Sequence, residues 1–296
     1  MSKIYFVPDV HLQEYSPRSR KDNYPTVILE KLEYIVEYVN KNNGECVFLG
    51  DVFNAVNLPM IYLYRVIDVF KKFNKVPYVI IGNHDVPRNN PDLINRTPLG
   101  LMEQAGFIKW LDKLEYDKVV IKGFHYTSPI LKADTDKKSI CVAHVFYEDN
   151  FALDHNLHIK DCLELGYNYY ILGHDHTVYD TVKNDKYQVY RIGSLSRGTA
   201  NEKQLNRDKV HILEYDLDFD TFNLVPVPCQ PAKEVFKESI FARKELNVVN
   251  TKEVLDNLVF TSNEGIYDVL DRAEQSDNIK AIVEEYLQAA GIFRTN

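Results

Sequence analysis

Short apolar runs alternate with helix-spaced apolar positions along the first third of the chain. Three of these runs have the length of buried strands, and they occupy residues 4–7, 46–49 and 76–81. Between the runs, apolar residues recur at helical spacing over 27–39 and 59–73, and Gly44 follows the first helical stretch as a stop signal. The order strand, helix, strand, helix, strand predicts a mainly parallel sheet with crossover helices.

The rest of the chain up to about residue 230 is richer in strand-forming runs. Turn-forming residues such as Asn184 and Asp185 separate some of these runs, which favours a second, mixed sheet. The runs lie at residues 119–121, 140–143, 169–172, 187–192, 210–215 and 222–227.

The character of the sequence changes near Pro231. Prolines end the strand pattern there, and residues 279–290 then carry apolar side chains in an amphipathic helical stripe. Residues 251–292 hold three basic and nine acidic side chains, a net charge of -6 out of -8 for the whole chain. We therefore predict a main domain at 1–230 and a helical capping or partner-binding region at 231–296.

The composition is that of an ordinary globular protein. Of the 296 residues, 45% are hydrophobic and 26% are charged, which argues against a disordered or low-complexity chain. With a net charge of -8, a chain-wide basic surface for nucleic acid is absent, so any polyanion site must be local. The four cysteines stand singly, which suggests neither a zinc ribbon nor a disulfide framework. No run reaches the length of a signal peptide or membrane span, so we expect a cytoplasmic protein without membrane contact.

Residue types that bind metal ions gather directly after the predicted strands. Five clusters share this placement: Asp9-Val10-His11, Gly50-Asp51, Gly82-Asn83-His84-Asp85, His144 and Gly173-His174-Asp175-His176. Taken singly, each has an ordinary explanation, since an Asp after a strand is usually a turn residue and a lone His is more often structural. Together they favour a dinuclear metal site, because open α/β sheets place functional residues at the carboxyl ends of their strands.

The series D-x-H, G-D, G-N-H-D, a lone His and G-H-x-H resembles the pattern of the calcineurin-like metallophosphoesterases over residues 3–195. The resemblance implies an α/β fold, a four-layer α-β-β-α sandwich of two mixed sheets with a small C-terminal helical appendage. It also implies that one metal ion is held by Asp9, His11, Asp51 and His176, and a second by Asp51, Asn83, His144 and His174. In that scheme His84 is the catalytic acid and Asp85 holds its imidazole.

The implied ligand set is chemically consistent with two divalent metal ions. Mixed nitrogen and oxygen ligands suit Mn²⁺, Fe or Zn²⁺ better than the all-oxygen shell that Mg²⁺ prefers, and we expect Mn²⁺. In the mechanism that the resemblance implies, a metal-bridging hydroxide attacks phosphorus in line and a protonated imidazole protonates the leaving oxygen. The sequence departs from the family pattern at Asn54, which takes the place of the second Asp in the G-D-x-x-D motif of many relatives. Together with Asp85 after G-N-H, it argues against a Ser/Thr protein phosphatase.

Within the family, the sequence is most similar to the Mre11/SbcD-type DNA repair nucleases. A basic loop at 17–21 follows the first motif, and a strand ending in Gly193-Ser194 looks like the close of the nuclease domain. This branch implies a DNA exo- or endonuclease and a C-terminal region that binds a Rad50/SbcC-like ATPase subunit. The apolar stripe at 279–290 must be buried, and the alternatives to such a subunit are the catalytic domain of the same chain and a second copy of the chain. Arg18, Arg20 and Arg197 would contact substrate phosphates, although a solvated surface is the alternative for any one basic loop.

Two other functions stay open. The first is a phosphodiesterase or phosphatase that acts on a nucleotide or a small phosphoester, which the sequence does not separate from a nuclease. The second is a non-catalytic scaffold with the same fold. All seven ligand positions and His84 are present, which disfavours the scaffold.

Overall fold

The computed structural model describes residues 2–147, 156–200 and 202–241. Contacts between Cα atoms divide the chain into two units, Met1–Lys237 and Glu238–Asn296, and the fold below is that of the first unit. The acidic segment at 251–292 and its apolar stripe lie outside the described residues. The predicted partner-binding role of the C-terminal region therefore stays a prediction.

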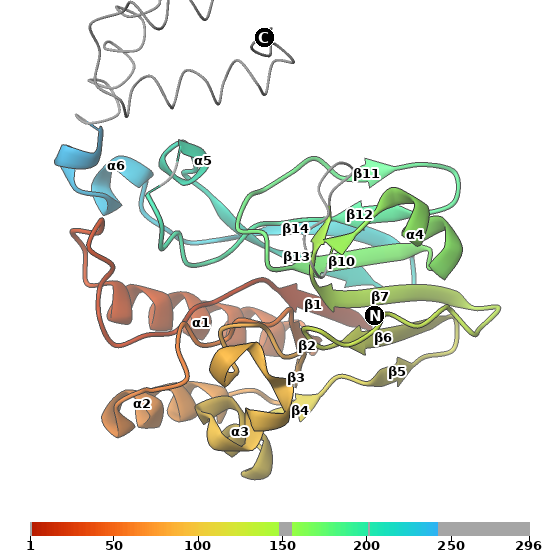
Figure 1. The fold of residues 1–296 in the computed structure, drawn as a ribbon, viewed down its shortest axis with the longest axis horizontal. Helices are drawn as coiled ribbons and strands as arrows, with labels where there is room; N and C mark the ends of the chain where they lie inside the picture. Colours follow the sequence, from red (N-terminus) through yellow and green to blue (C-terminus); the bar gives the residue numbers. More distant parts are fainter. Residues whose placement is uncertain (1, 148–155, 201, 242–296) are drawn as a thin grey trace, which may run out of the picture. The chain divides into compact units, whose positions relative to one another are not determined.

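The first sheet has six strands in the order β14-β13-β1-β2-β3-β4 (Figure 1). Their bounds are β1 Lys3–Val7, β2 Glu45–Phe48, β3 Tyr78–Val79, β4 Lys109–Trp110, β13 Val210–Asp216 and β14 Thr221–Val227. Strands β1 to β4 run parallel, whereas β13 and β14 pair antiparallel. Strand β3 begins directly after Pro77, which has no N–H to donate to a neighbouring strand, and it ends at Val79, before the apolar run at 76–81 does.

Three helices belong to the outer face of the first sheet (Figure 1). They are α1 Tyr24–Lys41, α2 Met60–Phe70 and α3 Pro98–Gln104. The apolar residues of α1 recur at intervals of three and four, so one face of the helix packs into the core while the other faces water. The two helices predicted from apolar spacing at 27–39 and 59–73 are thus confirmed as α1 and α2.

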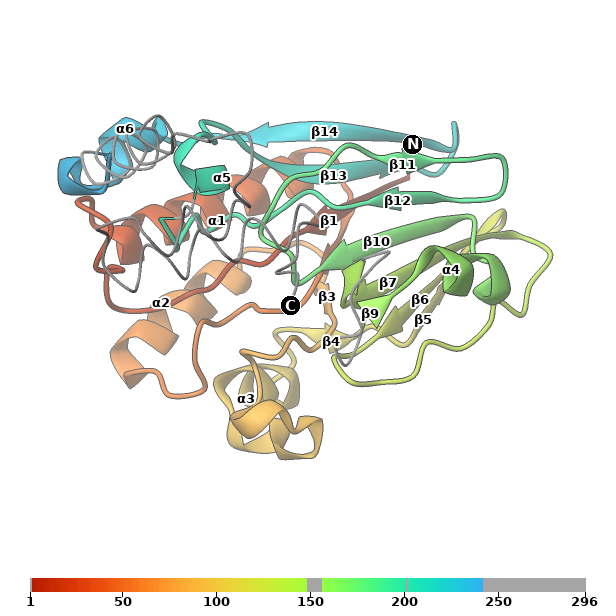
Figure 2. The same cartoon turned by 45° about the horizontal axis from the view of Figure 1, so that its top comes forward.

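The second sheet also has six strands, in the order β11-β12-β10-β7-β6-β5 (Figure 2). Their bounds are β5 Lys113–Glu115, β6 Val119–Phe124, β7 Lys138–His144, β10 Tyr169–Gly173, β11 Val182–Lys183 and β12 Gln188–Tyr190. The central strands pair in parallel and the two edge strands antiparallel, so the sheet is mixed, as predicted. Helix α4 (Ile159–Leu165) contributes Cys162 to a small core on the outer face of this sheet.

The two sheets pack against each other through a core of apolar side chains from both. Ile4 and Val47 of the first sheet meet Ile140 and Ile171 of the second in this buried cluster. The result is an α/β fold with two mixed six-stranded sheets, which confirms the predicted architecture. The remaining short elements are η1 Pro87–Asn89, η2 Pro91–Arg96, β8 Phe146–Tyr147, β9 Asn156–Leu157, α5 Glu202–Leu205 and α6 Ala232–Val235. Across the residues that the structure covers, no helix is long and apolar enough to cross a membrane.

Candidate metal centre

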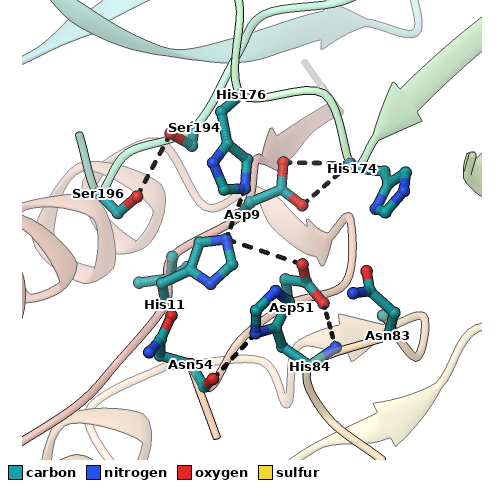
Figure 3. Close-up of polar contacts among 12 residues, drawn as sticks. Asp9, His11, Asp51, Asn54, Asn83, His84, His174, His176, Ser194 and Ser196 are labelled. Atoms are coloured by element: carbon teal, nitrogen blue, oxygen red, sulfur yellow. Dashed lines mark hydrogen bonds and ion pairs between the residues drawn. The ribbon is translucent and has the colours of Figure 1, made fainter. Parts of the chain in front are cut away.

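The five predicted clusters meet at one edge of the paired sheets. Asp9, Asp51 and Asn83 follow β1, β2 and β3, while His144 ends β7 and His174 follows β10. Parallel strands in each sheet deliver their carboxyl ends to the same edge, and the packed sheets bring the two edges together (Figure 3). Residues separated by more than 160 positions in the sequence therefore come within hydrogen-bond distance of each other.

Asp51 lies at the centre of the cluster and is buried. One carboxylate oxygen, Oδ1, accepts a hydrogen bond from the His84 main-chain N–H at 2.9 Å. The other, Oδ2, lies 3.7 Å from His11 Nε2 and 3.4 Å from His144 Nε2. Asp51 also belongs to both groups of converging ligand atoms that the described residues form, His11–Asp51–His84 and Asp51–His144–His174. This position between two groups fits a carboxylate shared by two cations.

Two imidazoles meet on one side of Asp51. The Nε2 atoms of His11 and His176 lie 2.7 Å apart (Figure 3). Burial lowers the pKa of His11 to about 3 and also lowers the pKa of His176, so both rings are neutral near pH 7. The buried Nδ1 of His11 has no hydrogen-bond partner among the described residues. Neutral rings with converging nitrogens are what metal ligation requires.

On the other side of Asp51, His144 and His174 converge. His144 Nε2 lies 3.2 Å from His174 Nδ1 and 3.1 Å from Asn83 Oδ1, while His144 Nδ1 contacts the Leu49 carbonyl at 2.8 Å. Burial lowers the pKa of His174 to about 3. Asp9 completes the arrangement, because its carboxylate accepts from the His174 N–H at 3.1 Å and lies 3.5 Å from His144 Nδ1.

The electrostatics of the cluster favour a positive charge at its centre. Burial raises the pKa of Asp9 to about 7. Burial also acts to raise the pKa of Asp51, but the neighbouring His144 and His11 have the larger effect and lower it. Of the two carboxylates, Asp51 therefore carries the negative charge more readily. Burial acts to lower the pKa of His144, but the Asp51 and Asp9 carboxylates outweigh it and raise that pKa to about 9. The carboxylates therefore stabilise a cation among them, and divalent metal ions fit this donor set of imidazole, amide and carboxylate groups.

The backbone at the site adopts conformations that few residues tolerate. His11, Asp51 and His174 have φ values of 52°, 47° and 88°, in the left-handed region. Such strain persists where the surrounding structure enforces it, which is common at functional sites. Gly82 is required for a different reason, since a Cβ at this position would collide with the main-chain nitrogen and the carboxylate of Asp51. The two motif loops can approach only because this residue has no side chain.

His84 and Asp85 differ from the arrangement that the sequence suggested. The His84 ring is exposed, and its Nδ1 contacts the main-chain carbonyl of Asn54 at 2.9 Å. Asp85 is buried and accepts instead from the N–H groups of Phe53 and Gly82, at 3.0 and 2.9 Å. The prediction that Asp85 holds the imidazole is therefore corrected, because both of its oxygens are engaged by the main chain and the Asn54 carbonyl takes that role.

The three arginines predicted to contact phosphates lie in different surroundings. Arg20 is buried and pairs with Asp22 at 2.6 Å, and Arg197 is buried and donates to the carbonyls of Arg207 and Gln230. Both guanidinium groups bind protein partners in the interior, so direct phosphate contacts are not supported for them. Arg18 is exposed, and for this residue the phosphate contact stays a prediction.

A cavity of about 370 Å³ opens beside three of the histidines, His11, His84 and His176. Its other lining residues are Gln13, Pro17, Tyr24, Asn54, Ser196, Gly198 and Thr199. None of these other residues is acidic or basic, so the wall facing the histidines consists of neutral hydrogen-bonding and apolar groups. Within the segment at 196–199 the sequence pattern singles out only Arg197, whereas the residues that line the cavity are its neighbours Ser196, Gly198 and Thr199, which belong to no metal-ligand or basic pattern.

Residues 2–178 match the family model described as calcineurin-like phosphoesterase. Because this match covers more than half of the chain, the chain belongs to the calcineurin-like phosphoesterase family, as its five clusters predicted. It is also similar to the structure of an archaeal phosphodiesterase, with 16% identity and a TM-score of 0.42 over 76% of this chain and 99% of that chain. A structure from Thermus thermophilus is similar with 10% identity, a TM-score of 0.47 and the same coverage. Both likenesses are remote, and neither assigns a substrate to this chain.

Family and geometry together define a metal-dependent phosphoesterase, a hydrolase with clustered His and Asp side chains consistent with a dinuclear metal site. The identity of the metal and the nuclease branch stay proposals. The Rad50/SbcC-like partner, implied by the resemblance, and the homodimer, suggested by the apolar stripe, also remain predictions.

Proposed function

We propose that the chain is a phosphodiesterase that requires two divalent cations, with Mn²⁺ as the activating ion. The observation that carries the proposal is the position of Asp51 in both groups of converging ligand atoms. In the assignment we propose, Asp9, His11, Asp51 and His176 hold one cation, and Asp51, Asn83, His144 and His174 hold the other. When bound, the cations supply positive charge that stabilises the phosphoryl oxygens of the transition state and activates the attacking water.

In this proposal His84 is the general acid. The Asn54 carbonyl can only accept a hydrogen bond, so the Nδ1 atom that contacts it carries a proton. This leaves Nε2 as the atom that delivers a proton to the leaving oxygen, after which solvent at the exposed ring restores it. Before the transfer the ring carries a proton on each nitrogen, and afterwards it keeps the Nδ1 proton that the carbonyl accepts.

The size of the cavity supports a diester substrate rather than a monoester. A volume of about 370 Å³ beside His11 and His84 lies within the range of pockets that hold whole small molecules. A monoester places only terminal oxygens on the side of phosphorus opposite its ester group, whereas a diester has substituents on two sides. The neutral polar wall at Gln13 and Asn54 suits the second substituent.

A nuclease acting on DNA is the second candidate. The observation that favours it is Arg18, an exposed cation next to Pro17, which lines the cavity. A guanidinium at this position is suited to a backbone phosphate of a strand that leaves the site.

Hydrolysis of bis(p-nitrophenyl) phosphate and of p-nitrophenyl phosphate, measured side by side with Mn²⁺, tests the proposal. We expect kcat/KM for the diester to exceed that for the monoester by about tenfold or more, with loss of activity in EDTA and recovery on adding Mn²⁺. A preference for the monoester would contradict the proposal. Linear duplex and single-stranded DNA, assayed under the same conditions, test the second candidate.

A further inference from the structure

The loop Leu195–Thr199 forms part of the cavity wall that faces His11 and His176, through Ser196, Gly198 and Thr199. Three consecutive carbonyl oxygens of this loop are bound by two cations in the protein interior. Lys31 Nζ donates to the Leu195 oxygen at 2.7 Å. Arg20 Nη1 donates to the oxygens of Ser196 and Arg197, at 3.1 Å each.

This arrangement fixes the direction of the loop's N–H groups. In a trans peptide the C=O and the following N–H point in opposite directions, and the described residues contain no cis peptide. The N–H groups of Ser196, Arg197 and Gly198 therefore point away from Lys31 and Arg20. Within the part of the chain that the structure covers, these three N–H groups have no hydrogen-bond acceptor. A row of main-chain N–H groups without acceptors, beside the His and Asp cluster, is suited to binding an anion.

A second observation, independent of the loop's geometry, is an excess of buried positive charge behind it. Arg20, Lys31, Arg197 and Arg207 are all at least nine-tenths buried. Among the described residues only Arg20 has a carboxylate partner, Asp22, whereas the other three donate to main-chain carbonyls. Buried charges are usually paired with opposite charges. Because interior charges interact over a low dielectric, the unpaired guanidinium groups of Arg197 and Arg207, together with Lys31 in its charged form, favour an anion near the loop.

We propose that the Leu195–Thr199 loop binds a second phosphate group of the substrate, next to the phosphate that is cleaved. This rests on the proposed function, because the cleaved phosphate is assigned to the His and Asp cluster that borders the same cavity. The substrates are then phosphodiesters that carry a further phosphate. A nucleic acid strand has this chemistry, and a nucleoside polyphosphate shares its adjacent phosphates, although anhydride bonds rather than diester bonds join them.

Thymidine dinucleotides distinguish these sources and test the proposal with the Mn²⁺-loaded protein. TpT has one phosphate, pTpT adds a 5′ phosphate, TpTp adds a 3′ phosphate, and ATP serves as the polyphosphate. We expect kcat/KM for pTpT or TpTp to exceed that for TpT by about tenfold through a lower KM, and we expect the KM of ATP, whose anhydride bonds differ in reactivity, to lie about tenfold below that of TpT. If bis(p-nitrophenyl) phosphate is hydrolysed but no added phosphate improves kcat/KM, the loop proposal is overturned and the proposed function stands. If no diester is hydrolysed, both fail.

A matched pair of variants locates the effect at the loop. A Cβ at Gly198 would meet only Ser196 Oγ, at 3.9 Å, so Gly198→Asp and Gly198→Asn both fit and differ in charge alone. We expect the ratio of kcat/KM for the preferred phosphorylated substrate to that for bis(p-nitrophenyl) phosphate to be about tenfold lower in Gly198→Asp than in Gly198→Asn. Equal ratios would overturn the proposal. Should Gly198→Asp not fold, Thr199→Glu and Thr199→Gln make the same comparison at an exposed position of the loop.

Discussion

His84 Nδ1 lies 2.9 Å from the main-chain carbonyl oxygen of Asn54. The carbonyl is itself held in place, since the Asn54 N–H donates to the Leu12 oxygen at 3.0 Å and its side-chain Nδ2 donates to Gln13 Oε1 at 2.6 Å. The loop after β2 thus aligns the ring that we assign as the general acid. Because a main-chain oxygen makes the contact, the identity of side chain 54 matters less than the position of the loop.

The first prediction separates an acid from a ligand at His84. His84→Ala should keep two bound metal ions and lose about 10²–10⁴-fold in kcat, the usual contribution of a general acid. Elemental analysis of the purified variant, beside its rate on bis(p-nitrophenyl) phosphate, checks both parts. Loss of one metal equivalent would mean that His84 is a ligand, a role that its nearness to His11 and Asp51 permits.

The second prediction concerns the shared carboxylate. Asp51→Asn should weaken both metal sites at once, because Asp51 belongs to both groups of ligand atoms and the amide carries no charge. Asn83→Ala should weaken only the site that includes His144, whose Nε2 it contacts at 3.1 Å. Calorimetric titration with Mn²⁺ compares the two variants. Two intact sites in Asp51→Asn would contradict the bridging assignment.

The third prediction concerns Asp85 and the stability of the chain. Asp85→Ala leaves the buried N–H groups of Phe53 and Gly82 without acceptors, at a cost of about 2–5 kcal/mol in the free energy of unfolding. Glu33→Ala removes an exposed ion pair with Lys72 and should cost less than about 1 kcal/mol. Urea unfolding measures both. Equal losses in the two variants would refute the role assigned to Asp85.

The fourth prediction is a pH dependence of stability that arises from Lys31. Burial lowers the pKa of Lys31 to about 7, against about 10.4 in an unfolded chain. Below pH 7 the ammonium is charged in both states, so the whole cost of burying its charge is present. As the pH rises above 7, the folded chain releases this proton while the unfolded chain keeps it, so the free energy of unfolding increases.

Between pH 7 and pH 9 the contribution of Lys31 amounts to about 2 kcal/mol. Lys31→Met, which has no titrating group, should lack this increase. Urea unfolding of both proteins at the two pH values gives the comparison. The same pH dependence in the wild type and in Lys31→Met would show that Lys31 is not the source.

The convergence of the residues that we propose as metal ligands could be predicted because two simple patterns coincide. Apolar runs such as 46–49 mark buried strands, and Asp51 follows its strand where parallel sheets expose functional groups. The contact of Asp85 could not be predicted in the same way. Its neighbour in the sequence is His84, but the backbone turns Asp85 into the interior, where two main-chain N–H groups need an acceptor.

The arginines of the basic loop show a second kind of structural feature that could not be predicted from the sequence. Arg18 and Arg20 lie two positions apart in one loop, yet the first is exposed and the second is buried against the 196–197 carbonyls. Their difference depends on a contact across more than 170 positions of sequence. The local charge pattern carries no information about such a contact. From the sequence alone, Arg20 is therefore as consistent with an exposed position as with a buried one.

The central claim is that two divalent cations act together around Asp51. Stepwise addition of Mn²⁺ to metal-free protein, with the rate of bis(p-nitrophenyl) phosphate hydrolysis measured at each step, tests it most directly. We predict that hydrolysis reaches its maximum only when two equivalents are bound, and that Asp51→Asn stays inactive at every step. Full activity with one equivalent bound, or undiminished activity in EDTA, would contradict the claim.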